Sequence, residues 1–250
     1  MGDRADVDLS ILRKQMAALS GRAGQRNAGS AEERPVELLA VPQVLADLLP
    51  RNGIARGSVI AADGARSMIV ALIAAVSGAG GQVAVVGMPQ LSMLSAVQMG
   101  ADLSCIAIVE DPGPDPVEIG GILLDGMDLV VLGLGGVAVP PARAKVLAGR
   151  ARKQSSVLMV TGGRWPGAQL RLSARVVAYR QTPSMRREGP RIADPGYGRI
   201  LGWRLQICVE GRGQRPMSSE IDCSSSDAND GLVRISTVGQ SSTVPLAVAN

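Results

Sequence analysis

Residues 57–80, GSVIAADGARSMIVALIAAVSGAG, decide the fold of this chain. Residues 58–62 are short, apolar and partly β-branched, with Gly57 before them and Asp63-Gly64 after them. This pattern predicts a buried parallel strand. From Arg66 onward apolar residues recur at helical spacing until glycines end the segment, which predicts a helix. A strand, a tight glycine turn and an apolar helix are typical of the first unit of a nucleotide-binding α/β domain.

The turn between this strand and this helix lacks a phosphate-binding loop. Such a loop needs the pattern G-x-x-x-x-G-K-[ST], in which backbone N–H groups surround the phosphates and a lysine reaches them. Here about three residues separate the strand from the helix, and Arg66-Ser67 is the nearest counterpart of the Lys-Thr pair. Because a helix N-terminus attracts anions, Asp63, Gly64, Arg66 and Ser67 are candidates for a nucleotide-binding remnant. The alternative is a tight strand–helix turn with a cap.

The composition of the 250 residues limits the chemistry that the chain can perform. There is no histidine, which excludes Ser-His-Asp and Cys-His nucleophile systems and zinc sites that use imidazole. The three cysteines lie far apart, so neither a four-thiolate metal site nor a disulfide framework is expected. We expect no catalytic residue, metal or cofactor. Without a signal-peptide pattern or a long apolar span, the chain is expected to be cytoplasmic, with no membrane partner.

Charge is divided sharply along the chain. Residues 67–142 hold seven acidic residues and no lysine or arginine, whereas residues 143–191 hold twelve basic residues and one acid. Such asymmetry favours a polyanion or an acidic partner surface. A solvated basic face, or neutralisation within a head-to-tail assembly, explains it equally well. The candidate DNA contacts are Arg143, Lys145, Arg164 and Arg171.

Strands and helices alternate regularly after the first unit. Strands are predicted at 82–87, 104–109, 127–132 and 156–161, and helices at 41–49, 89–99, 116–124 and 141–153. This alternation specifies a parallel sheet with right-handed crossovers and helices on its faces. Antiparallel strands are then predicted to extend the sheet at 172–180, 199–210 and 215–222. The predicted fold class is therefore α/β, with a parallel core, flanking helices and C-terminal antiparallel strands.

The pattern divides the chain into three parts. Residues 1–35 predict an amphipathic helix, at 6–19, followed by a flexible linker, and residues 36–222 form the core domain. Residues 223–250 are rich in Ser, Thr, Asp and Gly, which predicts a disordered tail. A lone amphipathic helix cannot bury its own apolar stripe, so we expect it to dock either on the main domain or on a neighbouring molecule. The second alternative would be self-association through this helix.

The contact with a protein partner is predicted in the carboxy-terminal third. A basic loop at 181–198 could steer an acidic partner, and apolar residues of the tail could anchor it. A tryptophan in the exposed-looking loop 162–167, GGRWPG, is either a partner anchor or a core residue. The candidate contact residues are Trp165, Arg186, Arg187, Arg191, Leu232, Val233 and Ile235. The competing hypothesis gives the contact to acidic helices between residues 100 and 128.

Several stretches resemble the RecA-type recombinases. Residues 49–59, LPRNGIARGSV, resemble the lead-in to their first core strand, and residues 161–163 with 172–177 resemble the end of their second DNA-binding loop and the strand after it. Residues 201–221 resemble their closing antiparallel pair. The short, catalytically degraded form is most similar to the ImuA family, RecA-like accessory proteins of bacterial mutagenic translesion synthesis, in its actinobacterial variety. The resemblance covers about residues 36–222 and implies a RecA-like core.

Departures from the RecA-like ATPases imply that the chain is a pseudo-ATPase. Those enzymes carry a catalytic glutamate after the second core strand, where this chain has Gly87-Met88-Pro89. They carry a Mg²⁺-binding aspartate at the end of the fourth strand, where residues 130–133 read VVLG. Loss of the lysine, the base and the metal ligand together removes substrate positioning, water activation and charge neutralisation.

The first functional hypothesis is a non-catalytic accessory protein of DNA-damage-induced mutagenesis. The resemblance implies an ImuB-type polymerase homologue and an error-prone polymerase complex as partners, RecA as a further partner, and association with the nucleoid during DNA damage. A second hypothesis is a weak or cryptic RecA-like ATPase that a neighbouring subunit completes. A third is a protein that binds DNA directly, weakly and without sequence preference, through its basic half.

Overall fold

The computed structural model of the chain describes residues 37–181, 200–225, 233–238 and 248–249. The predicted helix and linker at 1–35 therefore lie outside the described residues. The same is true of four candidate partner contacts, Arg186, Arg187, Arg191 and Leu232.

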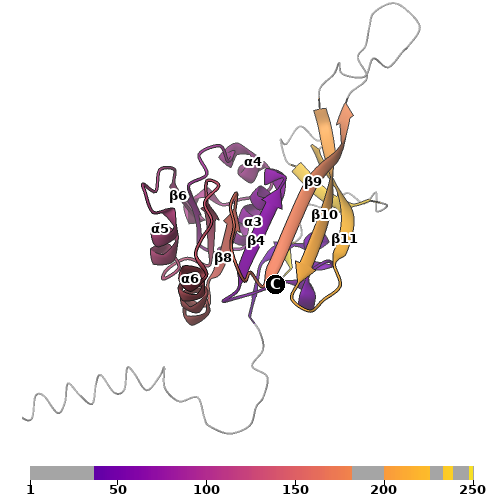
Figure 1. Ribbon diagram of the computed structural model, residues 1–250. Helices are drawn as coiled ribbons and strands as arrows, with labels where there is room; N and C mark the ends of the chain where they lie inside the picture. Colours follow the sequence, from indigo (N-terminus) through magenta and orange to yellow (C-terminus); the bar gives the residue numbers. More distant parts are fainter. Residues whose placement is uncertain (1–36, 182–199, 226–232, 239–247, 250) are drawn as a thin grey trace, which may run out of the picture. The chain divides into compact units, whose positions relative to one another are not determined.

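A nine-stranded sheet, with strand order β12-β11-β10-β9-β4-β8-β7-β5-β6, forms the centre of this part of the chain. The strands are β4 Val59–Gly64, β5 Val83–Val86, β6 Ile106–Val109, β7 Leu129–Gly133, β8 Val157–Thr161, β9 Leu170–Gln181, β10 Ile200–Gly211, β11 Met217–Ser225 and β12 Val233–Thr237. From β9 to β6 the strands run parallel, and β10, β11 and β12 add to the β9 side in antiparallel pairs (Figure 1). The predicted α/β class is confirmed.

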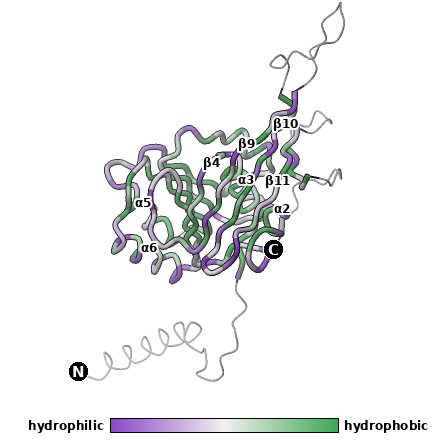
Figure 2. The backbone as a smooth tube through the Cα atoms, turned by 45° about the vertical axis from the view of Figure 1, so that its right-hand side comes forward, coloured by the Kyte–Doolittle hydropathy of each residue, from purple (hydrophilic) through white to green (hydrophobic). Residues whose placement is uncertain are grey.

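Helices cover both faces of the parallel core. On one face, α3 Arg66–Gly78 and α4 Met93–Gln98 share an apolar cluster with residues of β10, β11 and β12. On the other face, α5 Pro116–Leu123 and α6 Pro141–Gln154 pack over β7 and β8. The strands β4, β5, β7 and β8 therefore read as continuous apolar runs, because both of their faces are buried. Figure 2 shows hydrophobic colour concentrated along the central strands and helix α3.

Several short elements precede, interrupt or follow this core. They are β1 Leu38–Leu39, β2 Val41–Pro42, helix α2 Gln43–Ala46, a 3-10 turn at Pro50–Asn52, β3 Ile54–Ala55, a second 3-10 turn at Leu103–Cys105, and β13 Val248–Ala249. Strands β1 and β3 form a separate antiparallel pair, as do β13 and β2. The helix predicted at 41–49 is thus reduced to four residues. The helix predicted at 89–99 starts only at Met93, because the Ser92 side chain accepts a hydrogen bond from the Ser95 N–H and caps it there.

The direction of β9 differs from the prediction. Residues 172–180 were expected to join the sheet antiparallel, but β9 runs parallel to β4, with Ile60 opposite Leu170 and Gly64 opposite Ala174. The connecting residues 162–169 return the chain to the level of Ile60 before β9 starts. The parallel core therefore has one more strand than the alternation of strands and helices indicated.

The prediction of a disordered tail at 223–250 is wrong for part of that stretch. Strand β11 continues to Ser225, and β12 pairs with it, with Ile235 opposite Cys223. Ile235 is 9% exposed and belongs to the apolar cluster under α3, and Val233 packs against the same cluster. The alternation of Val233 and Ile235 with polar residues is the two-residue period of a half-buried strand. Ile235 is therefore a core residue rather than an exposed partner anchor.

Candidate functional site

The candidate site is the turn between β4 and α3, where a RecA-type ATPase would hold phosphate. Gly64 ends β4 with φ +92°, and the N–H of Ala65 donates a hydrogen bond of 2.7 Å to the carbonyl oxygen of Ala174 in β9. A Cβ atom on Gly64 would lie 1.9 Å from that oxygen. The backbone of β9 therefore lies directly against the turn, and α3 begins at Arg66 without a side-chain cap.

Of the four predicted nucleotide-binding residues, Arg66 and Ser67 line one hollow, whereas Asp63 pairs elsewhere. Asp63 forms an ion pair of 3.1 Å with Arg171, on the solvent-exposed face of β9. The Arg66 guanidinium instead donates to the side-chain oxygen of Gln90 at 3.3 Å. Ser67 lines a hollow of about 180 Å³ beside α4, which Trp203 also lines. The structure thus joins Asp63 to a residue predicted to bind DNA, and separates it from Arg66 and Ser67.

The positions of the missing base and metal ligand are closed by packing. Gly87 follows β5 with φ +67°, and its N–H donates to the carbonyl oxygen of Val109 at 2.9 Å. Gly133 ends β7, and a Cβ atom there would lie 2.5 Å from the Gly87 oxygen and 2.9 Å from the Met88 side chain. The ends of β5 and β7 therefore meet backbone to backbone. No carboxylate side chain fits at Gly133 without moving them.

The carboxylates near the strand ends have structural roles. Glu110 and Asp111 after β6 are exposed, and Asp111 accepts the N–H of Gly113 in a turn. Asp128 lies at the opposite edge of the sheet, where it forms an ion pair with Arg56 and accepts the N–H of Gln82 at 2.7 Å. Burial raises the pKa of Asp128, but the hydrogen bonds from Arg56 and Gln82 outweigh it and hold the pKa below its usual value. Asp128 thus ties the start of β7 to Arg56 and to the backbone of Gln82.

Replacing Asp128 with asparagine should make stability less dependent on pH. The pKa of Asp128 is lowered in the folded chain, so its ionised form stabilises the fold above the unfolded pKa of about 3.9. That contribution is lost as the pH falls through the lower folded pKa. We expect Asp128→Asn to cost about 1–2 kcal/mol at pH 7, and the deficit to shrink below about pH 4. Urea denaturation at stepped pH measures this, and a deficit that grows in acid would contradict it.

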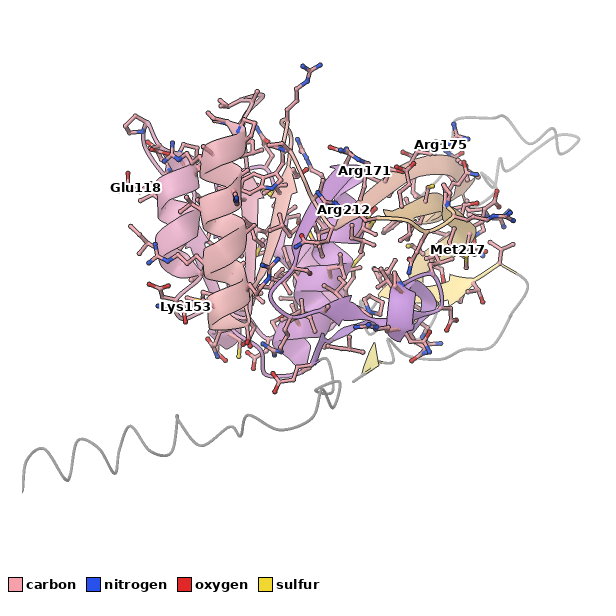
Figure 3. The ribbon with its side chains drawn as sticks, turned by 60° about the horizontal axis from the view of Figure 1, so that its bottom comes forward. Glu118, Lys153, Arg171, Arg175, Arg212 and Met217 are labelled. Carbon is pink, nitrogen blue, oxygen red and sulfur yellow. The ribbon has the colours of Figure 1, made fainter. Side chains whose placement is uncertain are left out.

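The predicted DNA contacts do not form one basic patch. Arg143 forms an ion pair with Asp115, which caps α5, and Arg171 pairs with Asp63. Lys145 on α6 and Arg164 in the 162–169 loop are exposed. Arg171 and Arg175, labelled in Figure 3, lie on the solvent-exposed face of the sheet that β9, β10 and β11 form. This face also carries acidic side chains. These are Asp63, Glu210, Glu220 and Asp222.

Trp165 is a core residue, so the packing alternative is the correct one. Its side chain is 6% exposed and lies in the cluster under α5 and α6. The neighbouring Arg164 bonds through its backbone to Val137 and Val139 at 3.1 and 3.0 Å. A Cβ atom on Gly163 would lie 2.5 Å from the Val137 oxygen. The adjacent glycines were the available sequence signal, because they permit this close approach of two loops.

Comparison with known proteins identifies the family. The family model MT3502 N-terminal domain matches residues 47–167, which hold β3 to β8. The chain is 44% identical over 204 residues to "Uncharacterized protein Rv3395c" of Mycobacterium tuberculosis, an alignment that covers 82% of this chain and 92% of that protein. The chain belongs to the Rv3395c family. In this member no helix of the described residues has both the length and the apolar character needed to cross a bilayer.

The fold of this Rv3395c-family member is RecA-like. The crystal structure of a KaiC-like protein from Pyrococcus horikoshii superposes on it with a TM-score of 0.50 and 10% sequence identity. The match covers 81% of this chain and all of that one. At such low identity the likeness concerns the fold alone. The resemblance to the ImuA family therefore stays a prediction.

Proposed function

We propose that this Rv3395c-family protein is a non-catalytic RecA-like module that acts by binding a protein partner. The observation that carries the proposal is the closed turn at Gly64. Phosphate binding requires backbone N–H groups that are free to surround the anion. Here the Ala65 N–H is already bonded to Ala174, and the backbone of β9 lies directly against the turn.

The packing of the other strand ends supports the same conclusion. Phosphoryl transfer needs a metal ion on the phosphates and a residue that positions the nucleophile. Gly87 and Gly133 stand at these two positions and contact each other through the backbone. A neighbouring subunit that completed the site would have to supply both the base and the metal ligand, and the Ala65 N–H would still be bonded to β9. This disfavours a cryptic ATPase.

The resemblance to the ImuA family supports a finer role within this proposal. In that role the chain is an accessory protein of DNA-damage-induced mutagenesis and translesion synthesis. Its partners would be an ImuB-type polymerase homologue, the error-prone polymerase complex and RecA, at the nucleoid during DNA damage. A direct DNA-binding role has less support, because two of the four candidate arginine and lysine side chains are neutralised by Asp63 and Asp115.

Titration of the full chain with Mg-ATP tests the absence of catalysis. Because the turn at Gly64 is closed, we expect no saturable heat in calorimetry up to millimolar ATP and no release of phosphate. A RecA-type ATPase with an intact phosphate loop serves as the positive control. Saturable binding accompanied by turnover would contradict the proposal.

The partner role is tested separately in cells exposed to a DNA-damaging agent. The tagged full chain should co-purify with an ImuB-type polymerase homologue, whereas a tag-only control should not. Failure of this capture, with Mg-ATP still inert, would reject the mutagenesis role and leave the non-catalytic module intact.

A further inference from the structure

A hollow of about 440 Å³ lies where strands β4 and β9 begin, at the opposite end of these strands from the closed turn. Ser58, just before β4, and Leu170, the first residue of β9, line it together with the segment around β3 and the end of β10. Its volume is within the range of about 300–1,000 Å³ that ligand sites occupy. Neither the predicted site residues nor the proposed function uses this hollow.

The wall of the hollow combines apolar side chains with side-chain amides. Ile54 and Leu170 are buried, and Leu38 is half-buried beside Gly53. Gln169 and Gln214 also line it, and the Gln169 oxygen is already held by the Val59 N–H at 2.7 Å. An apolar wall with a few polar groups is the usual composition of a binding pocket.

Two arginines give the hollow a positive rim. Arg51 and Arg212 line it and are exposed, and the described part of the chain contributes no carboxylate to its lining. Within the described residues neither guanidinium forms a salt bridge, and Arg212 reaches only the Gly167 oxygen at 3.5 Å. Figure 3 shows Arg212 among the side chains at this end of the molecule. Guanidinium groups bind carboxylates with two parallel hydrogen bonds.

The backbone holds Arg51 in a conformation that arginine disfavours. Arg51 has φ 61° and Asn52 has φ 58°, and the N–H of Gly53 bonds to the oxygen of Pro50 at 3.4 Å. Positive φ at both central residues is the pattern of a type I′ turn, which favours asparagine and glycine. Left-handed conformations of other residues are costly and concentrate at functional sites. Glycine at position 51 would satisfy the turn better, but it would remove the guanidinium.

Strand β3 offers a free edge on the same hollow. The Arg56 N–H bonds to the Glu37 oxygen, and Leu38 lies opposite Ala55 in the antiparallel pair with β1. In such a pair the hydrogen-bonding direction alternates, so Ala55 turns its N–H and C=O away from β1. Ala55 lines the hollow, and β3 has no second neighbouring strand among the described residues. An extended peptide can add to such an edge.

We propose that this hollow binds a short, extended acidic peptide of the protein partner. The peptide backbone adds to β3 at Ala55, its carboxylates bind Arg51 and Arg212, and one apolar side chain packs on Ile54 and Leu170. This inference rests on the proposed function as a partner-binding module. A nucleic acid fits less well, because among the described residues no aromatic side chain lines the hollow to stack on a base.

Fluorescence anisotropy with the full chain tests this site. The probe is a labelled five-residue peptide with leucine at its centre and glutamate at the other positions. We expect the matched glutamine peptide to bind at least about tenfold more weakly, and Arg51→Gly and Arg212→Gln each to weaken the acidic peptide by about tenfold or more. Arg175→Gln, which removes an exposed arginine outside the hollow, is the matched control and should leave affinity unchanged. Arg51→Gly should melt no lower than the parent chain, so its loss of affinity is not unfolding.

Four outcomes would overturn the site. The first is equal affinity for the acidic and glutamine peptides, and the second is unchanged affinity in both arginine variants. The third is stronger binding of oligothymidylate than of the peptide, which would assign the hollow to nucleic acid. This chain has an acidic pair of its own, Glu32-Glu33, shortly before β1 in the sequence. The fourth outcome is a gain in peptide affinity in Glu32→Gln/Glu33→Gln, which would mean that this pair competes for the hollow. If these outcomes arise while partner capture persists, the site fails and the proposed function stands.

Discussion

Replacing Gly64 with alanine is expected to destabilise the folded chain by about 3–5 kcal/mol. The new Cβ atom would lie 1.9 Å from the carbonyl oxygen of Ala174, and φ at this position is +92°. The backbone atoms of Ala174 cannot rotate out of the way, as the end of a flexible side chain can. Relief of the overlap requires β9 to move, which would break the Ala65 to Ala174 hydrogen bond and disturb the pairing of β4 with β9.

Gly80→Ala is the matched control for this substitution. Gly80 has nearly the same φ, +83°, but a Cβ atom there would have no neighbour within 4 Å. We expect a cost of only about 1–2 kcal/mol, from the left-handed backbone alone. Urea denaturation of both variants measures the difference. Equal losses would mean that β9 does not press against the turn, and the main support for a closed phosphate site would be lost.

The contact at Gly64 connects stability to function. A phosphate loop at this turn would need free backbone N–H groups, whereas the Ala65 N–H is bonded to β9, which packs directly against Gly64. The strand pairing that extends the parallel core is therefore the same feature that closes the nucleotide site. Because the turn is closed by β9, replacing Arg66 with lysine is not by itself expected to create nucleotide binding.

Replacing Trp165 with alanine is expected to cost about 3–5 kcal/mol, as is usual when a large aromatic side chain is removed from a core. Trp165 is 6% exposed and packs in the cluster that includes Leu134 and Val139. Because its loop bonds to the loop at 137–139, the surroundings cannot collapse freely into the cavity. The free energy of unfolding from urea denaturation measures the loss.

Val137→Ala serves as the control in the neighbouring loop. Val137 is 54% exposed, so its truncation should change stability by no more than about 0.5 kcal/mol. A small effect of Trp165→Ala combined with loss of partner capture would restore the interpretation of Trp165 as an exposed anchor.

Local patterns in the sequence determined the class of the fold. The strand–turn–helix of residues 57–80 and the later alternation predict β4 to β8 and their helices to within a few residues, because hydrophobic periodicity and glycine turns are properties of neighbouring residues. The lack of a phosphate loop can also be recognised from short stretches of neighbouring residues. Its absence is evident from the short turn and from the residues at 87–89 and 130–133.

Contacts between distant segments were decided only by the tertiary structure. The sequence alone did not indicate that β9 is parallel to β4, that Ile235 is buried, or that Asp128 pairs with Arg56, 72 residues away. The hollow was likewise decided by contacts between distant segments. Arg51 and Arg212 lie far apart in the sequence, and they line one hollow only because β3, β9 and β10 come together in the fold. Side chains that meet in this way share no period or spacing along the chain, so the packing of the sheet alone determines which residues form a site.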